Sequence, residues 1–262
     1  MSTSMSMVRR VLWELWLPVL LVAIWWFASA NSTNFYFPPL ADIMDEFVDI
    51  WFFEGIRTEI WPSVQRLALG FGIAVVAGVV LGMLLGVVDW LDNAVRPIVE
   101  FLRATPGVAI LPVMVLLLGL GTSMKVGIIA LVATWPILLN TIDGVRSVEP
   151  VLRQVAASHR LKLSHRIRFI ILPNAAPQIF AGARTALAIS VVAMVISEMV
   201  GTPGGIGYFI LDAQRSFNTV AMWTGIIALG ILGYLLNKLF ALVEGRALSW
   251  HRGMTAHNNG GK

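Results

Sequence analysis

The sequence predicts an all-α membrane protein with six transmembrane helices, and three observations carry that prediction. Of 262 residues, 57% are hydrophobic and only 13% are charged, whereas soluble domains usually carry about 25% charged residues. The mean hydropathy is +0.78. Apolar stretches near the ~20 residues that a helix needs to cross a bilayer recur along the chain. Together these features predict an integral membrane protein.

The first span is predicted at 13–30, after a cytoplasmic N-terminus at 1–12. Four tryptophans between Trp13 and Trp26 favour an anchored helix with aromatic belts at the membrane surfaces. A cleaved signal peptide is the alternative. Arg9 and Arg10, the apolar stretch and the run Ala28-Ser29-Ala30 resemble the three regions of such a peptide.

A periplasmic segment is predicted at 31–63, with an amphipathic helix over 38–53. Its acidic residues fall on one helical face and its apolar residues on the other, namely Leu40, Ile43, Met44, Phe47, Ile50 and Trp51. Two placements are open for this helix. It lies on the outer membrane surface or it packs against the helical bundle.

The remaining spans form a core predicted at 64–243, followed by a cytoplasmic tail at 244–262. We expect spans at 64–88, 101–121, 126–142, 179–200 and 221–243, with a short turn at 89–97. The span at 64–88 has a small residue at every fourth position: Gly70, Ala74, Gly78, Gly82 and Gly86. In lipid, such a face lets helix backbones approach closely, so we predict a helix-packing seam.

Polar residues and prolines within three spans are candidates for lining a translocation path. Prolines free backbone carbonyls, which is tolerated in a membrane where neighbouring groups or a wet cavity satisfy them. The alternative is that the prolines only kink their helices, that Arg184 reaches the surface, and that Glu198 reaches water. The candidate path residues are Thr105, Pro106, Thr134, Asn140, Arg184, Ser190 and Glu198.

A basic helical hairpin is predicted at 149–177, between the fourth and fifth spans. Pro150 suits the first position of a helix, where its missing N–H costs nothing. An apolar stripe at helical spacing follows it, formed by Val151, Leu152, Val155 and Ala156. A second apolar run is expected to end at Pro173 and Pro177. The stripe needs burial against something, so we predict that 150–163 docks on a partner.

The lysine and arginine distribution predicts which side of the membrane the hairpin faces. With six spans and both termini inside, Arg57, Arg66, Lys125 and Arg215 fall outside, and the other fifteen of the 19 basic residues fall at the cytoplasmic side. Cytoplasmic loops are enriched in Lys and Arg. The hairpin is therefore predicted to be cytoplasmic.

Motifs for catalysis are missing from the sequence. It has no Gly-rich loop ending in Gly-Lys-Ser or Gly-Lys-Thr, no Gly-x-Ser-x-Gly elbow, and no His pair with zinc-protease spacing. Zero cysteines exclude thiolate metal sites. The basic hairpin lacks interleaved aromatics, so nucleic acid is not an expected partner. We expect no catalytic residue, no metal site and no cofactor in this chain.

The hairpin resembles the permease signature of bacterial ABC importers. In that family the signature starts with a Glu and two Ala. A Gly follows six positions after the Glu, and an Ile, a Leu and a Pro come after the Gly. Ala156, Ile170, Leu172 and Pro173 match, whereas Gln154, Val155 and Arg160 stand for the acid, the first alanine and the glycine.

That glycine is read as the turn between two short helices, where a positive φ is cheap. In that conformation Arg160 would cost roughly 1 kcal/mol. We therefore expect the turn to lie one residue away or to be tighter.

The resemblance extends from about Phe37 to Trp250 and is to the nitrate, sulfonate, taurine and bicarbonate branch of these permeases. Stretches that carry it include Arg103-Ala104-Thr105-Pro106, Gly119-Leu120-Gly121 and Gly205-Ile206-Gly207-Tyr208. The resemblance implies the six-helix fold of a type I ABC importer permease in the inner membrane, with a cytoplasmic coupling helix at the hairpin.

The resemblance also implies partners and a role. The chain would form the translocation path for a small anion, sulfonates first, delivered by an external solute-binding protein. It would work as a homodimer with two copies of an ATPase that holds ATP and Mg. Residues implied to dock the ATPase are Gln154, Val155, Ala156, Ala157, Ser158, His159, Arg160 and Leu161. An ion-coupled secondary transporter is the alternative, and an intramembrane enzyme is a further one.

Overall fold

The computed structural model describes residues 2–250, with side chains described for 16–250 apart from 53, 153 and 157. Every regular element in this part of the chain is helical. The α-helices are α1 (Ser2–Ser29), α2 (Leu40–Ile50), α3 (Trp61–Val87), α4 (Asp89–Ala104), α5 (Leu111–Leu118), α6 (Thr122–Arg146), α7 (Pro150–Ser158), α8 (Leu163–Arg166), α9 (Leu172–Met199), α10 (Ile206–Arg215) and α11 (Thr219–Ala247). Two π-helical segments, η1 (Trp51–Ile60) and η3 (Ile167–Ile171), and one 3₁₀ turn, η2 (Gly107–Ile110), join them.

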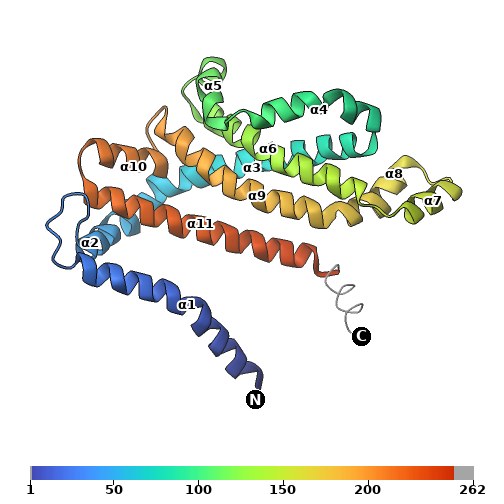
Figure 1. The fold of residues 1–262 in the computed structure, drawn as a ribbon. Coiled ribbons are helices and arrows are strands. Elements are labelled where there is room, and N and C mark those ends of the chain that lie inside the picture. Colours follow the sequence, from blue (N-terminus) through green and yellow to red (C-terminus); the bar gives the residue numbers. More distant parts are fainter. Residues whose placement is uncertain (1, 251–262) are drawn as a thin grey trace.

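Three long helices, α3, α6 and α9, form the centre of the bundle, and α6 lies between the other two. Helix α11 runs alongside α9 (Figure 1). Helices α2 and α10 gather at one end of the bundle, and α7 and α8 lie at the opposite end. The length of the membrane-spanning helices therefore separates α2 and α10 from α7 and α8.

Helices α3 and α6 pack along the small-residue seam that the sequence predicts. A Cβ added at Gly78 would lie 2.8 Å from Ile137 Cβ, and one at Gly70 would lie 2.7 Å from Ile129 Cβ. Gly82 and Gly86 contact α6 in the same way. Bare glycine backbones thus receive the branched side chains of α6, which confirms the predicted seam.

Helix α6 approaches α9 equally closely. A Cβ at Gly182 of α9 would lie 2.7 Å from Asn140 Cβ, and one at Gly144 of α6 would lie 3.0 Å from the Ala175 carbonyl oxygen. Small buried residues, Ala133, Ala183 and Ala186, fill the middle of this contact. The three helices are held by close backbone packing from one end to the other.

The structure has a bend where the sequence predicts a straight span at 101–121 and a turn at 89–97. Helix α4 already begins at Asp89, and it ends at Ala104 because Pro106 disfavours helical dihedrals at Thr105, which is extended (φ −73°, ψ 122°). The pair formed by α4 and the segment Gly107–Leu118 is bent by 92°. Helix α5 consequently turns out of the line of α4 (Figure 1) and packs against the start of α6, where a Cβ at Gly127 would lie 2.7 Å from the end of the Met114 side chain.

The sequence predicts that a second apolar run ends at Pro173 and Pro177, and the structure shows that the helix itself continues through both prolines. Helix α8, the π-helical segment and α9 form one continuous helix, Leu163–Met199, of 37 residues. A proline within a helix lacks the N–H and crowds the carbonyl four residues before it. The wider turn of the π-helix immediately before Leu172 accommodates Pro173. The π-helical segment η1 likewise ends just before the first turn of α3, which contains Pro62.

Four helices of the described chain are long and apolar enough to cross a membrane, or five if the bent pair counts as one span. They contain 54–87, 122–146, 163–199 and 219–247. The described apolar part of α1, Trp16–Ser29, is shorter than a span. A sixth span at 13–30 therefore stays a prediction.

The amphipathic helix α2 packs against the bundle rather than lying free on a surface. Leu40 and Ile43 are buried, and α2 contacts α11. Ser29, at the end of α1, accepts the Leu40 N–H at 3.0 Å and so anchors the first turn of α2. Of the two placements that the sequence left open, the structure supports packing.

The seam predicts a sharp difference between two glycines of α3. Replacing Gly78 with Ala puts a methyl group against Ile137, so the protein should lose about 1–3 kcal/mol of stability from overpacking. Gly72 has nothing within 4 Å of an added Cβ, so Gly72→Ala should cause no loss. Thermal unfolding of the two purified variants in detergent measures the difference, and equal midpoints would contradict the seam.

Candidate functional site

The turn of the hairpin is built at Arg160. His159 donates its N–H to the Val155 carbonyl at 3.0 Å, and Leu161 donates to the Ala156 carbonyl at 3.1 Å. The second bond is the six-residue closure of a Schellman motif, which needs a left-handed residue at the position before Leu161. Arg160 takes that role with φ +49°. Both expected alternatives, a displaced turn and a tighter one, are therefore wrong.

Helix α7 exposes most of its apolar stripe. Val151 is 64% exposed, Leu152 43% and Val155 49%. Ala156, at 1%, is the one buried residue among the described side chains of α7. Leu161 and Leu163 continue the exposed apolar surface through the turn. We call these five exposed residues the hairpin face: Val151, Leu152, Val155, Leu161 and Leu163.

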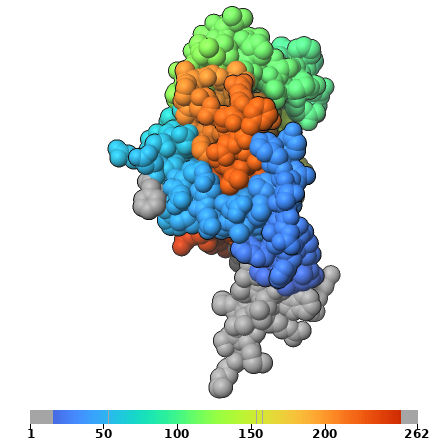
Figure 2. All heavy atoms as spheres, turned by 90° about the vertical axis from the view of Figure 1, so that its left-hand side faces the viewer, coloured from blue at the N-terminus to red at the C-terminus, as the bar shows by residue number. Residues whose placement is uncertain are grey.

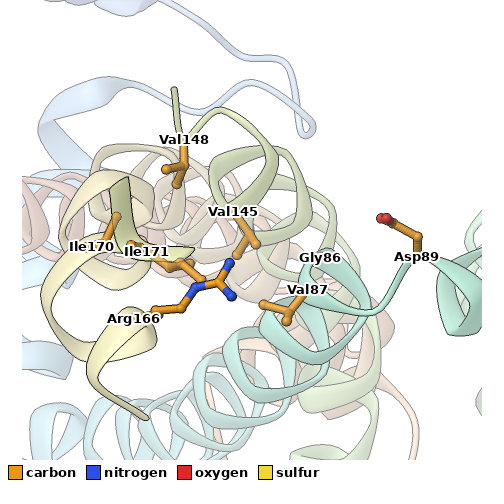
Figure 3. Close-up of a pocket in the computed structure, with 9 residues that line it drawn as sticks. Gly86, Val87, Asp89, Val145, Val148, Arg166, Ile170 and Ile171 are labelled. Atoms are coloured by element: carbon orange, nitrogen blue, oxygen red, sulfur yellow. The ribbon is translucent and has the colours of Figure 1, made fainter. Parts of the chain in front are cut away.

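Ala156 faces a small cavity between the hairpin and the bundle. The cavity has a volume of about 80 Å³ and is lined by residues of α3, α4, α6, α7, α8 and η3 and by Val148 of the loop after α6. Figure 3 shows the Arg166 side chain pointing across it toward Val145 and Val87, while Asp89 lies at its edge. Val148, Ile171 and Ala175 form the buried cluster beside it, which fixes the base of the hairpin to α6 and α9.

The predicted docking residues therefore fall into two groups. Ala156 lies against the bundle and is withdrawn from any contact surface. The side chain of Ala157 lies outside the described residues. The others are exposed at the end of the molecule: Gln154, Val155, Ser158, His159, Arg160 and Leu161.

The predicted path residues lie on α6, on α9 and at the bend that follows α4. Thr134, Asn140 and Ser190 each donate to a carbonyl one turn back in their own helix, at 2.7, 2.8 and 2.7 Å. Thr105 and Pro106 lie at the bend between α4 and η2. An apolar cavity of about 180 Å³ adjoins that bend, lined by residues that include Gly107, Val132 and Ile189. None of the predicted path residues lines it.

The two charged residues predicted on the fifth span have different surroundings. Arg184 is exposed and pairs with Glu244 of α11. Glu198 is completely buried and does not reach water, contrary to the simpler alternative. Its carboxylate accepts from Arg66 Nη1 at 2.7 Å and from Ser63 Oγ at 2.8 Å. A buried charge is tolerated when it is paired and hydrogen-bonded in this way.

Further polar groups surround this ion pair, and sequence reasoning missed them as a site. Lys125, also fully buried, donates to the Thr202 carbonyl at 2.9 Å. Glu59 accepts the Gly205 N–H at 2.8 Å. We call this group the outer charge cluster: Glu59, Ser63, Arg66, Lys125 and Glu198. An ionisable residue within a span is a signal for function, but no pattern pairs Arg66 with a residue 132 positions away.

No metal site is present in the described part of the chain, where no three His, Asp or Glu residues are grouped as ligands. The geometry instead defines a class of protein. It is a helical membrane protein with a close-packed centre, a buried charge cluster at one end and a projecting apolar hairpin at the other. Such a hairpin is suited to a protein partner.

Comparison with known families identifies the class as a transport permease. The model for the binding-protein-dependent transport system inner membrane component matches residues 74–248. The chain belongs to this family and is a multi-pass, inner-membrane permease subunit of an ABC importer. Family membership supports the importer prediction, and nothing in the comparisons supports the ion-coupled alternative.

Relatives among known proteins cover most of the chain. It is 30% identical to the aliphatic sulfonates transport permease protein SsuC of Bacillus subtilis, over 89% of this chain and 86% of that protein. It is 35% identical to the nitrate import permease protein NrtB of Synechocystis, over 73% and 70%. It is 26% identical to the taurine transport permease TauC of Escherichia coli, over 93% and 91%.

Solved structures show the same fold. An inward-facing structure of the MetNI methionine ABC transporter matches with a TM-score of 0.65 at 21% identity, over 74% of this chain and 95% of that chain. An amino acid ABC transporter matches with a TM-score of 0.54 at 19% identity. The fold is that of type I ABC importer permeases, as the sequence predicts.

The turn yields a prediction that separates backbone strain from charge. Arg160→Gly should raise the stability of the protein by about 1 kcal/mol, because glycine adopts a positive φ without the clash of a Cβ. Arg160→Ala removes the same charge but keeps the strain, so it should not stabilise. Thermal unfolding of both variants distinguishes the two effects, and equal stabilisation by Ala would contradict the strain.

Proposed function

We propose that this chain is the permease of an importer for small organic anions, sulfonates first, and that a separate ATPase drives it by docking on the hairpin face. The observation that carries the proposal is the exposure of Val151, Leu152 and Val155 on α7. Apolar side chains at the end of a membrane bundle are stabilised when a partner covers them.

Docking at this position has a direct mechanical consequence. Helix α8 is continuous with α9, so the second arm of the hairpin is the end of a membrane-spanning helix. ATP-driven approach of two ATPase subunits would bring two hairpins together. Each hairpin would carry α9 with it, and the close packing of α9 on α6 and of α6 on α3 would pass the movement on.

The residues of the hairpin then have separate roles. Val155 and its exposed neighbours make the contact with the ATPase, together with Gln154, Ser158, His159 and Arg160. Ala156 seats the helix against the bundle, because a larger side chain would enter the small cavity that it lines. This chain contributes no nucleotide chemistry, so ATP and Mg are held by the partner.

Two copies of this chain would enclose the path, in a two-fold symmetric dimer served by two ATPase subunits and one external binding protein. The hairpin and both chain termini would lie in the cytoplasm, which agrees with the distribution of basic residues. Helix α10, whose first N–H groups bond to the outer charge cluster, would then lie at the periplasmic end of the bundle, opposite α7 and α8 (Figure 1).

A small anion is the proposed solute because of the relatives named above. By their names, these relatives are permeases for aliphatic sulfonates, taurine and nitrate. The apolar cavity beside the bend between α4 and α5 suits a solute with an aliphatic part better than a bare inorganic ion. Sulfonates therefore rank before nitrate and bicarbonate.

Replacing Val155 with Asp tests the docking role. A charge on the hairpin face must be desolvated at the contact, so the ATPase should no longer copurify with the permease. Asn93→Asp adds the same charge at an exposed position of α4 and should leave the complex intact. Insertion of both variants into the membrane is checked by fractionation. A V155D complex that retains the ATPase and transports normally would refute the docking role.

The solute is tested on the binding protein that delivers it. Calorimetric titration of that protein with taurine, an alkanesulfonate, nitrate and bicarbonate should give measurable heat with the sulfonates and none with the two inorganic ions. Tight binding of nitrate or bicarbonate alone would contradict the proposed solute class, and it would leave the docking proposal unaffected.

A further inference from the structure

Helix α10 is capped from outside, by side chains of other elements. The N–H of Gly205 donates to Glu59 Oε2 at 2.8 Å, that of Ile206 to Ser63 Oγ at 3.0 Å, and that of Gly207 to Glu198 Oε2 at 3.1 Å. No side chain at its own N-cap position does this. The first N–H groups of a helix have no partners within the helix and carry its positive dipole end. Two carboxylates and a hydroxyl satisfy them here.

Glu198 is the centre of this attachment. It accepts hydrogen bonds from Ser63 and Arg66 of α3 and from Gly207 of α10, and it belongs to α9 itself. Arg66 also donates to the Gly204 carbonyl at 2.9 Å, and Lys125 of α6 holds Thr202. The loop 200–205 and the start of α10 are therefore tied at one point to the three helices at the centre of the bundle.

The glycines of this segment permit the close approach of α10 to the carboxylate. Gly205 has φ +108°, and a Cβ there would overlap the Glu198 carboxyl group. A Cβ at Gly207 would overlap the Val195 carbonyl oxygen of α9. The backbone of α10 can reach Glu198 only because both positions lack side chains. The run of glycines thus serves the contact rather than loop flexibility.

Glu198 lies at the far end of the helix that begins in the hairpin, so its contacts connect α10 to that helix. The helix that begins at Leu163, in the hairpin, ends at Met199, one residue after Glu198. Its 37 residues span roughly 55 Å at the ~1.5 Å rise of a helix. Figure 2 looks onto the far end of the bundle, where the segment near residues 200–215, in orange, lies at the centre of the face, between the blue α2 region and the green α5.

We propose that Glu198, with Ser63 and Arg66, is the anchor that makes α10 move with α9 at the outer end of the permease. The proposal rests on the proposed function, in which the ATPase displaces the hairpin end of the same helix. Glu198 is then a positioning residue for transport. Glu198 keeps α10 rigidly attached to α9, so a displacement of the hairpin also displaces α10 at the outer face.

Spin labels test the anchor directly because the natural chain has no cysteine. Labels at cysteines replacing Val192 of α9 and Ser216, just after α10, report the distance between the two elements in the permease in lipid nanodiscs. The wild-type background should give one narrow distance distribution. E198Q leaves Arg66 buried without a counter-charge and should broaden it. G205A keeps every charge but collides with Glu198, and should broaden it as well.

A second measurement tests the transmission. A single label at Ser216 in each protomer of the ATPase complex reports the separation of the two outer ends. Trapping with Mg-ATP and vanadate should shift this separation in the wild-type background, and E198Q should abolish the shift while the ATPase stays bound and hydrolyses ATP. Glu100→Gln, which removes the exposed carboxylate paired with Arg96 on α4, should behave as the wild type.

The outcomes separate the two proposals. An unchanged α9–α10 distance in both E198Q and G205A, or a normal vanadate shift in E198Q, would overturn the anchor. Should E198Q fail to insert, G205A and the milder Ser63→Ala, which removes one bond to the carboxylate and the cap on Ile206, give the same readouts. Failure of the wild-type permease to retain an ATPase would overturn the docking proposal. The α9–α10 distance would then still test the anchor.

Discussion

Close backbone contact between α3, α6 and α9 is the constraint on which the rest of this structure depends. Lipid tails are as apolar as leucine, so burial of apolar surface drives helices together only weakly in a membrane. Dispersion contacts between closely spaced helices must replace it. Gly78 against Ile137 on one side of α6, and Gly182 against Asn140 on the other, provide that spacing. With these three helices held as one body, both ends of the bundle acquire defined positions.

The two ends meet different physical requirements. At the hairpin end, apolar side chains such as Val155 remain exposed and call for a partner protein. At the other end, Glu198 is buried, where an unpaired charge would be very costly, and both of its carboxylate oxygens accept hydrogen bonds, from Ser63, Arg66 and Gly207. Helix α9 carries both features. The π-helical turn before Pro173 keeps it continuous between them.

Local patterns predicted much of this arrangement, and the failures have identifiable causes. The four-residue repeat of glycines indicated the packing seam, because that spacing places the residues on one helical face. The stripe on α7 indicated a helix, but periodicity does not say which of its residues turns toward the bundle. Only the structure shows that Ala156 turns inward while Val155 turns outward. Arg160 adopts a conformation that intrinsic preference disfavours, because the Schellman closure by Leu161 requires it.

Composition by itself determined that the protein is a helical membrane protein, and the resemblance of the hairpin to a family signature implied a permease, because hydropathy and a signature are both properties of short stretches of chain. Tertiary structure alone decided that α4 and α5 are bent by 92°, that α9 passes through two prolines, and that Glu198 joins Arg66, Ser63 and the start of α10. The angle at Pro106 and the continuity of α9 through Pro173 depend on the backbone geometry that each proline takes in the folded chain, and the Glu198 contacts join groups far apart in the sequence. No local pattern encodes which distant partner a buried charge will find.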